Sequence, residues 1–344
     1  MIFRLFTGLF VTSKAIFMRR YIEATAETFP VAGSFTISRG SRTEIHVVRC
    51  TIGDGEVKGI GECVPYARYG ETIEGVMADI RALADAVADG LDRVTLQDIM
   101  KPGAARNAVD CALWDIEAKL SGKSVAASIL TKPPQPIVTA YTISLGDADS
   151  MAAKAAENAH RPLLKIKTGT VDDEARLRAV RAAAPGAQII IDANEGWTEE
   201  NVEHHFALAA ELKIALIEQP LPAGKDHILS RIARPVPICA DESVHLTTDL
   251  ASLRDRYDAI NIKLDKTGGL TEALLMKREA DRLGYTVMVG CMLGTSLGMA
   301  PAVLLAQDTA FADLDGPLLL ARDHVPGLIY DGSLVHPPEP QLWG

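Results

Sequence analysis

Three carboxylates stand where short apolar segments of the second half of the chain end. Asp192, Glu218 and Asp241 each follow a run of branched apolar residues. Side chains at the ends of neighbouring parallel strands can converge on one point. Three carboxylates would repel each other there unless a cation neutralised them, and all-oxygen ligation with room for substrate and water suits Mg²⁺. The alternative is that each acid is a solvated loop residue or a helix N-cap.

Two lysines share one face of an earlier apolar segment. Lys165 and Lys167 flank Ile166, so the alternation of a strand points both ammonium groups to the same side. Two adjacent, partly buried ammonium groups disfavour each other's charge, so we expect one lysine pKa to fall toward neutrality and that lysine to act as a base. Lys263 ends a later apolar segment directly, and we favour it over Lys266 in the following loop as the partner on the opposite side. Surface or phosphate-binding lysines are the alternative.

These groups could together move a proton on the carbon next to a carboxylate. Removing such a proton creates an enediolate, whose charged oxygens a divalent cation and Lys165 would stabilise. If one lysine removes the proton and the other returns one to the opposite face, the carbon is epimerised. Lyase chemistry would need a leaving group on the neighbouring carbon.

The elements that must position these residues alternate from about residue 136 between short apolar strands and longer amphipathic helices. The expected strands are 137–143, 163–167, 188–192, 215–218, 236–240, 259–263, 286–290 and a short one near Ala312. Their polar or small ends are Thr142, Lys167, Asp192, Glu218, Asp241, Lys263, Gly290 and Asp313. Successive ends lie 22 to 27 residues apart, about one βα unit. Eight such units predict a barrel with its chemistry at the C-terminal strand ends, and no Gly-x-Gly-x-x-Gly segment supports a dinucleotide fold.

The first part of the chain follows a different pattern. Segment 20–62 is strand-like with a turn at Asp54-Gly55, and helices are expected over 72–90 and 103–121, which predicts a small α+β domain. Residues 1–17 are apolar and aromatic but contain too short an apolar run to span a bilayer. We interpret them as a non-native or disordered extension.

Composition narrows the class of protein. The 344 residues are 48% hydrophobic and carry a net charge of −10, which disfavours nucleic acid and anionic membranes as partners. Five cysteines without C-x-x-C spacing indicate free thiols in a reducing cytoplasm.

The chain resembles the muconate-lactonising subgroup of the enolase superfamily in several ordered motifs. They are Lys165-Ile-Lys167, Ile191-Asp192-Ala-Asn194, Ile217-Glu218-Gln-Pro220, Ala240-Asp241-Glu-Ser243 and Asn261-Ile-Lys263-Leu-Asp-Lys-Thr-Gly-Gly269. Two further runs, Gly290-Cys-Met-Leu-Gly-Thr295 and Asp313-Leu-Asp315-Gly-Pro317, are similar more narrowly to L-Ala-D/L-Glu epimerases. The resemblance implies a modified TIM barrel, (β/α)7β, with an N-terminal α+β capping domain. We expect an extension over 1–17, the capping domain over 18–130, the barrel over 131–317 and a return to the capping domain over 318–344.

The resemblance also implies roles for individual residues. Asp192, Glu218 and Asp241 would bind one Mg²⁺ per subunit, Lys167 and Lys263 would be the acid/bases, and Lys165 would hold the substrate carboxylate. Asp313 and Asp315 would bind the α-ammonium of a dipeptide, unless they only form the turn before Gly316-Pro317.

The cap and the first strand supply further candidates. Arg42, in the capping loop 38–42, is the candidate partner for a glutamate side-chain carboxylate, or else a surface arginine. Thr142 would line the pocket, or serve the core or a cap. The Gly- and Tyr-rich segment 61–71 would be a second capping loop, with no single residue assigned.

The implied activity is epimerisation of L-Ala-D/L-Glu and similar dipeptides in murein peptide metabolism. The rivals are a dipeptide epimerase of other specificity, an o-succinylbenzoate synthase or cycloisomerase-type lyase, and a non-catalytic metal-binding barrel. Arg42, Asp313 and Asp315 favour a zwitterionic peptide over a substrate that is not an amino acid. Relatives are often homo-oligomers, and the sequence leaves the oligomeric state open.

Overall fold

Eight parallel strands carry the charged strand ends. The computed structural model describes residues 19–344, so the expected extension over 1–17 lies outside the described residues. The strands pair in chain order: β5 (Tyr141–Ile143), β6 (Leu163–Lys167), β7 (Gln188–Asp192), β8 (Leu216–Glu218), β9 (Ile238–Ala240), β10 (Ala259–Ile262), β11 (Thr286–Gly290) and β12 (Phe311–Asp313). The main-chain N–H of Ala140 donates to the oxygen of Ala312 at 2.8 Å and links the two ends of the sheet. The predicted modified barrel is confirmed.

The first predicted strand is partly wrong. Instead of one strand over 137–143, β4 (Ile137–Val138) pairs with β14 (Leu334–Val335) in a small separate sheet with β13 (Tyr330–Asp331). The main-chain N–H of Thr139 donates to Ser333, while its hydroxyl accepts from Leu314 N–H at 2.8 Å. Thr139 therefore turns the chain from the small sheet into the barrel, and only β5 joins the parallel strands.

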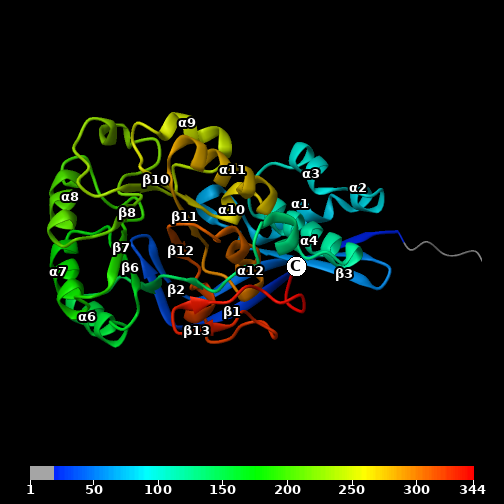
Figure 1. Cartoon of the computed structure of the whole chain (residues 1–344), viewed down its shortest axis with the longest axis horizontal. Coiled ribbons are helices and arrows are strands. Elements are labelled where there is room, and N and C mark those ends of the chain that lie inside the picture. The colour runs from blue at the N-terminus through cyan, green and yellow to red at the C-terminus, as the bar shows by residue number, and fades with distance from the viewer. Residues whose placement is uncertain (1–18) are drawn as a thin grey trace, which may run out of the picture.

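Helices cover the outside of the barrel (Figure 1). They are α6 (Ala148–Glu157), α7 (Asp173–Ala183), α8 (Val202–Glu211), α9 (Leu250–Leu253), α10 (Leu264–Thr267), α11 (Leu270–Leu283) and α12 (Ser296–Leu305). Within the described part of the chain, only a short 3₁₀ turn over His227–Ser230 separates β8 from β9. None of the described helices combines the length and the apolar character that a membrane crossing needs.

Strand alternation divides the barrel interior into an apolar floor and a charged mouth. The floor is a separate buried cluster that includes Leu163, Ile190, Leu216 and Cys239. Residues two positions further along a strand point to the same face. The same alternation therefore brings Lys165, Asp192, Glu218 and Asp241 into the interior above that floor.

The N-terminal domain is an antiparallel sheet packed on helices. The sheet comprises β1 (Tyr21–Ile37), β2 (Gly40–Asp54) and β3 (Val57–Cys63), with the predicted turn at Asp54-Gly55. The helices are α1 (Ile73–Arg81), α2 (Ala84–Ala88), α3 (Arg93–Ile99), α4 (Ala104–Ser121) and α5 (Val125–Ile129). The helix expected over 72–90 is thus two helices, whereas that over 103–121 is α4.

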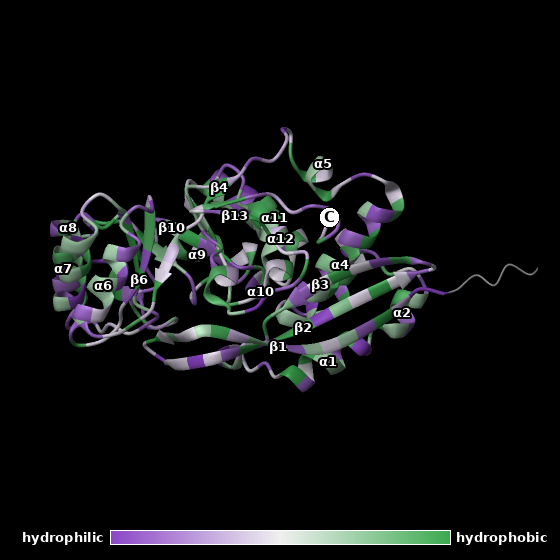
Figure 2. Cartoon of the chain, turned by 90° about the horizontal axis from the view of Figure 1, so that it is seen from below, coloured by the Kyte–Doolittle hydropathy of each residue, from purple (hydrophilic) through white to green (hydrophobic). Residues whose placement is uncertain are grey.

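The two parts of the molecule are joined at several places. The long β1–β2 ribbon runs from the cap helices to the barrel (Figure 2). On α4, the guanidinium of Arg106 donates to the main-chain oxygens of Thr267 and Gly268 at 2.7 and 3.1 Å, and Asn107 donates to Asp265 at 2.8 Å. The indole of Trp343, near the C-terminus, donates to the oxygen of Cys111 at 3.0 Å. The cap is therefore anchored on the segment that follows Lys263.

Close packing of α4 on β3 gives a first prediction. A Cβ at Gly61 would collide with the main-chain oxygen of Ala108 on α4, so Gly61→Ala must push the helix away from the sheet. We expect a loss of about 1–3 kcal/mol of unfolding free energy, measured by urea denaturation. Gly186→Ala is the control, because a Cβ there meets nothing within 4 Å. Equal stability of the two variants would contradict this packing.

Candidate active site

Lys165 lies at the centre of the buried carboxylates. Its ammonium nitrogen is 2.6 Å from Glu218 Oε2, 2.7 Å from Asp313 Oδ2 and 3.1 Å from Asp192 Oδ2. Burial would lower the pKa of Lys165, but the three negative charges outweigh it and hold the pKa well above its usual value. For this lysine the expected fall in pKa is therefore wrong, because strand alternation adds carboxylates around the ammonium as well as a second lysine.

The two predicted acid/bases line one cavity. Lys167 Nζ donates to Asp192 Oδ2 at 2.7 Å, and Lys263 Nζ donates to Asp241 Oδ2 at 2.7 Å. Both lysines line a cavity of about 90 Å³ at the boundary of barrel and cap. They come from β6 and from the end of β10, with three intervening strands that carry the acids. Both lysines therefore reach one cavity from separated strands of the barrel.

Lys266 has a different place from Lys263. Its ammonium is buried and donates to the Asp241 carboxylate at 2.6 Å and to the main-chain oxygens of Asp241 and Asn261 at 2.6 and 3.0 Å. These hydrogen bonds hold the Asp241 side chain in place. The preference for Lys263 as the group that faces the cavity agrees with this geometry.

The carboxylates have the chemistry of a hard-cation site. Glu218 Oε1 accepts from Asn261, whereas buried Glu218 Oε2 has no hydrogen bond of acceptable geometry despite its nearness to Lys165. Burial raises the pKa of Glu218, and the charge of Asp192 raises it further. Within residues 19–344, no three acidic, histidine or cysteine side chains form a ready-made metal cluster, since lysine ammonium groups lie among the carboxylates. The donor set of Asp192, Glu218 and Asp241 nevertheless fits a divalent cation, which prefers such oxygens.

Asp313, Asp315 and Thr142 are brought together at the junction of β12 and β5. Asp313 Oδ2 accepts from Lys165, while buried Asp313 Oδ1 has no hydrogen-bond partner. Asp315 Oδ2 accepts from the main-chain N–H of Thr142 at 2.6 Å. Burial and the charge of Asp313 raise the pKa of Asp315. The pair is therefore an acidic corner with an unused acceptor, and Thr142 contributes to it through its main chain.

The cap closes the cavity with aromatic and cationic side chains. Arg42 is exposed to the cavity, and its guanidinium carbon lies 5.8 Å from the ring centre of Tyr66. The cavity is also lined by Phe35, whose ring centre is 5.8 Å from Lys167 Nζ. Arg42 therefore lines the cavity with its charge available to a ligand.

Sequence reasoning missed a second arginine, Arg39, which fastens the β1–β2 turn to the barrel. It donates to the main-chain oxygen of Asn194 at 2.8 Å and forms an ion pair of 2.9 Å with Glu242. It also donates to Tyr66 at 3.0 Å, and Arg68 pairs with Glu195 at 2.5 Å. Glu242 lines the cavity, and its position directly after Asp241 was the only sequence feature that pointed to it. Arg39 lies inside the expected capping loop 38–42 but received no role of its own, because its partners lie far away in the chain.

Family comparisons cover both parts of the molecule. Residues 21–130 match the family Mandelate racemase / muconate lactonizing enzyme, N-terminal domain, and residues 148–339 match the family Enolase C-terminal domain-like. The second match alone spans more than half of the chain.

Individual relatives agree with these matches. The chain is 44% identical to the L-Ala-D/L-Glu epimerase of Escherichia coli K12, over 92% of this chain and 99% of the relative. It is 42% identical to the N-acetyl-D-glutamate racemase of a Pseudoalteromonas species, over 85% of this chain and 93% of the relative.

Solved structures give the same result. One is an enolase family member from Agrobacterium tumefaciens with homology to dipeptide epimerases, solved with bound sodium and L-Ala-L-Glu. It is 76% identical to this chain with a TM-score of 0.94, and the match covers 94% of this chain and 100% of that one. The dipeptide epimerase of Enterococcus faecalis, in complex with Mg and L-Leu-L-Tyr, is 27% identical with a TM-score of 0.86, over 94% and 98%. With its strand-end acids, its paired lysines and its cap, this chain belongs to the mandelate racemase and muconate-lactonising branch of the enolase superfamily.

Proposed function

We propose that this protein epimerises dipeptides, L-Ala-D/L-Glu above all, by a 1,1-proton transfer between Lys167 and Lys263. One observation carries the proposal: two lysines from separated strands line a single cavity beside a row of buried carboxylates. The relatives that act on or bind such dipeptides support the substrate class.

The reaction balances with the groups at the site. One lysine, as the free amine, takes the α-proton of the second residue, and the electron pair of the C–H bond enters the carboxylate to give an enediolate. The opposite lysine, as the ammonium, delivers a proton to the other face, which inverts the carbon. Lys165, whose ammonium lies 2.6 Å from Glu218, would balance the charge that develops on the carboxylate oxygens.

We propose Asp192, Glu218 and Asp241 as the groups that would hold one Mg²⁺. When bound, the ion would supply positive charge to the carboxylate of the substrate. The Mg bound to the relative from E. faecalis supports this choice. Asn261 and Lys266 position two of these acids by their bonds to Glu218 and Asp241.

The two ends of the dipeptide would meet opposite charges. Asp313 and Asp315 would bind the α-ammonium, and Arg42 would bind the glutamate side chain through a two-pronged contact. An N-acetyl-glutamate substrate has no such ammonium, so the acidic corner argues for a peptide over the activity of the Pseudoalteromonas relative. We further propose that the dipeptides come from murein peptides and that the protein acts in the cytoplasm.

Isotope exchange in D₂O tests the reaction. With Mg²⁺ and L-Ala-L-Glu, we expect deuterium at the glutamate α-carbon together with the L,D isomer, followed by ¹H NMR. Lys167→Met and Lys263→Met should each lower epimerisation by about 10²–10⁴-fold, and each should keep α-exchange for only one isomer, opposite in the two variants. Lys132→Met, at an exposed lysine, is the control. Exchange of both isomers in either variant would remove that lysine from its role.

Replacement of Asp313 separates the dipeptide from the acylated amino acid. Asp313→Asn should raise KM for L-Ala-L-Glu by about tenfold or more, because a charge-assisted bond to the ammonium is lost. Any turnover of N-acetyl-glutamate should fall by less. A larger effect on N-acetyl-glutamate, in steady-state assays of both substrates, would argue that Asp313 serves Lys165 and not the ammonium.

Arg42 should set the preference for glutamate. Arg42→Met is expected to raise KM for L-Ala-L-Glu by about tenfold or more, because the side-chain carboxylate loses a charged partner. KM for L-Ala-L-Leu should change little, and Arg42→Lys should recover part of the loss. Parallel losses for both dipeptides would mean that Arg42 supports the cap instead.

A further inference from the structure

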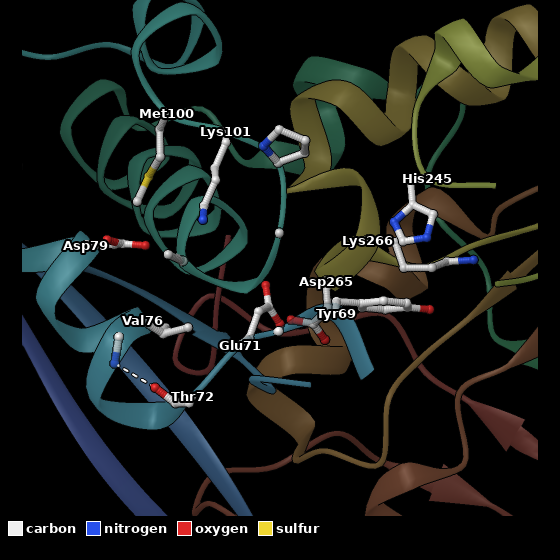
Figure 3. A pocket seen from close by; sticks show the side chains of 15 residues that line it. Tyr69, Glu71, Thr72, Val76, Asp79, Met100, Lys101, His245, Asp265 and Lys266 are labelled. Carbon is white, nitrogen blue, oxygen red and sulfur yellow. Dashed lines mark hydrogen bonds between the residues drawn. The ribbon is translucent and has the colours of Figure 1, made fainter. Parts of the chain in front are cut away.

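A second, larger cavity lies beside the substrate cavity. It measures about 480 Å³ and is bounded by α1, by the connection from α3 to α4, and by the barrel segments after β9 and β10 (Figure 3). Its walls carry charged and polar side chains, among them Glu71, Asp79, Lys101, His245 and Asp265. A cavity of this size and polarity holds water.

The aromatic ring of Tyr69 forms part of the wall of both cavities. It lines the larger cavity together with Lys266, and it lines the smaller one together with Lys263. Its ring packs edge-on against Tyr66 and His245, with ring centres 5.3 and 4.7 Å apart. Two neighbours therefore hold the ring in place at the boundary.

At this boundary one carboxylate is shared by a lysine from each cavity. Asp241 lies 2.7 Å from Lys263, which lines the smaller cavity, and 2.6 Å from Lys266, which lines the larger one. Burial raises the pKa of the Tyr69 hydroxyl, the charge of Asp241 raises it further, and the charge of Lys263 opposes this. Lys167, in contrast, faces the ring of Phe35 across 5.8 Å. Of the two lysines, Lys263 is thus the one that shares a carboxylate with a wall residue of the larger cavity, at the boundary that Tyr69 forms.

We propose that Tyr69 is a partition that keeps the water of the larger cavity away from Lys263. This inference rests on the proposed proton transfer. A proton taken by Lys263 stays on its ammonium only while exchange with solvent is slower than its return, and excluding water slows that exchange. The ring is thereby a positioning residue for one half of the reaction, since it protects the lysine on one face of the substrate carbon.

The test uses the asymmetry between the two faces. Lys167→Met identifies the isomer whose α-proton Lys263 removes, because only that isomer still exchanges. The reaction is then run in D₂O from each isomer in turn. The measured quantity is the ratio of deuterium in the recovered substrate to product formed. In Tyr69→Ala we expect this ratio to rise by about threefold or more for the Lys263 isomer, as water gains access, and to stay unchanged for the other isomer.

Matched variants separate the ring from other effects. Tyr69→Phe keeps the ring and should leave both ratios as in the parent protein, and Met100→Ala, on another wall of the larger cavity, should do the same. Tyr69→Leu replaces the alanine variant if that variant does not fold. Equal ratios in parent and alanine variant, or an equal rise for both isomers, overturns the partition. A parent protein that exchanges no α-proton overturns the proposed function instead.

Discussion

Neutralisation of buried charge at the barrel mouth is the constraint on which the rest of the structure depends. Isolated charges cannot be buried cheaply, so each must meet an opposite charge with good geometry. Here Lys165 contacts three carboxylates within 3.1 Å, and Lys263 and Lys266 share Asp241. Removing any one member would leave its partners with less compensating charge in the buried interior. The cluster therefore fixes its own geometry, and it concentrates charge where the proposed reaction creates an anion.

The apolar floor makes this cluster possible. Four charged residues at the mouth stand two positions after a floor residue: Lys165, Asp192, Glu218 and Asp241 follow Leu163, Ile190, Leu216 and Cys239. A slip of one residue in the strand register would turn the apolar floor residues toward the outer surface, and it would turn the acids toward the helices. The same alternation of side chains along the strands therefore builds the buried core of the barrel and positions the proposed catalytic residues.

The alternation of apolar and charged residues along each strand was enough to predict the residues at the barrel mouth. The acids, Lys167 and Lys263 could be placed because each closes an apolar run of strand length, and Lys165 because it shares a strand face with Lys167. The break at Thr139 was missed, because residues 137–143 read as one strand and the competing partner β14 lies almost two hundred residues later. Arg39, Glu242 and Tyr69 escaped for the same reason. Their partners belong to the other part of the molecule, and no local periodicity encodes a contact between domains.

The cap is held on the barrel by two groups of contacts that differ in burial. On one side, α4 is tied to the segment after Lys263 through Arg106 and Asn107, with main-chain and buried partners. On the other side, the β1–β2 turn is held by Arg39, whose side chain is 28% exposed and whose carboxylate partner Glu242 is buried. The first contact can open only if several buried groups lose their partners, whereas the second involves one buried carboxylate, Glu242, which lines the cavity and would meet water as the turn moves away. If a dipeptide enters beneath the cap, the physically cheaper movement is therefore that of the turn carrying Arg39 and Arg42, with Lys263 and its loop remaining fixed.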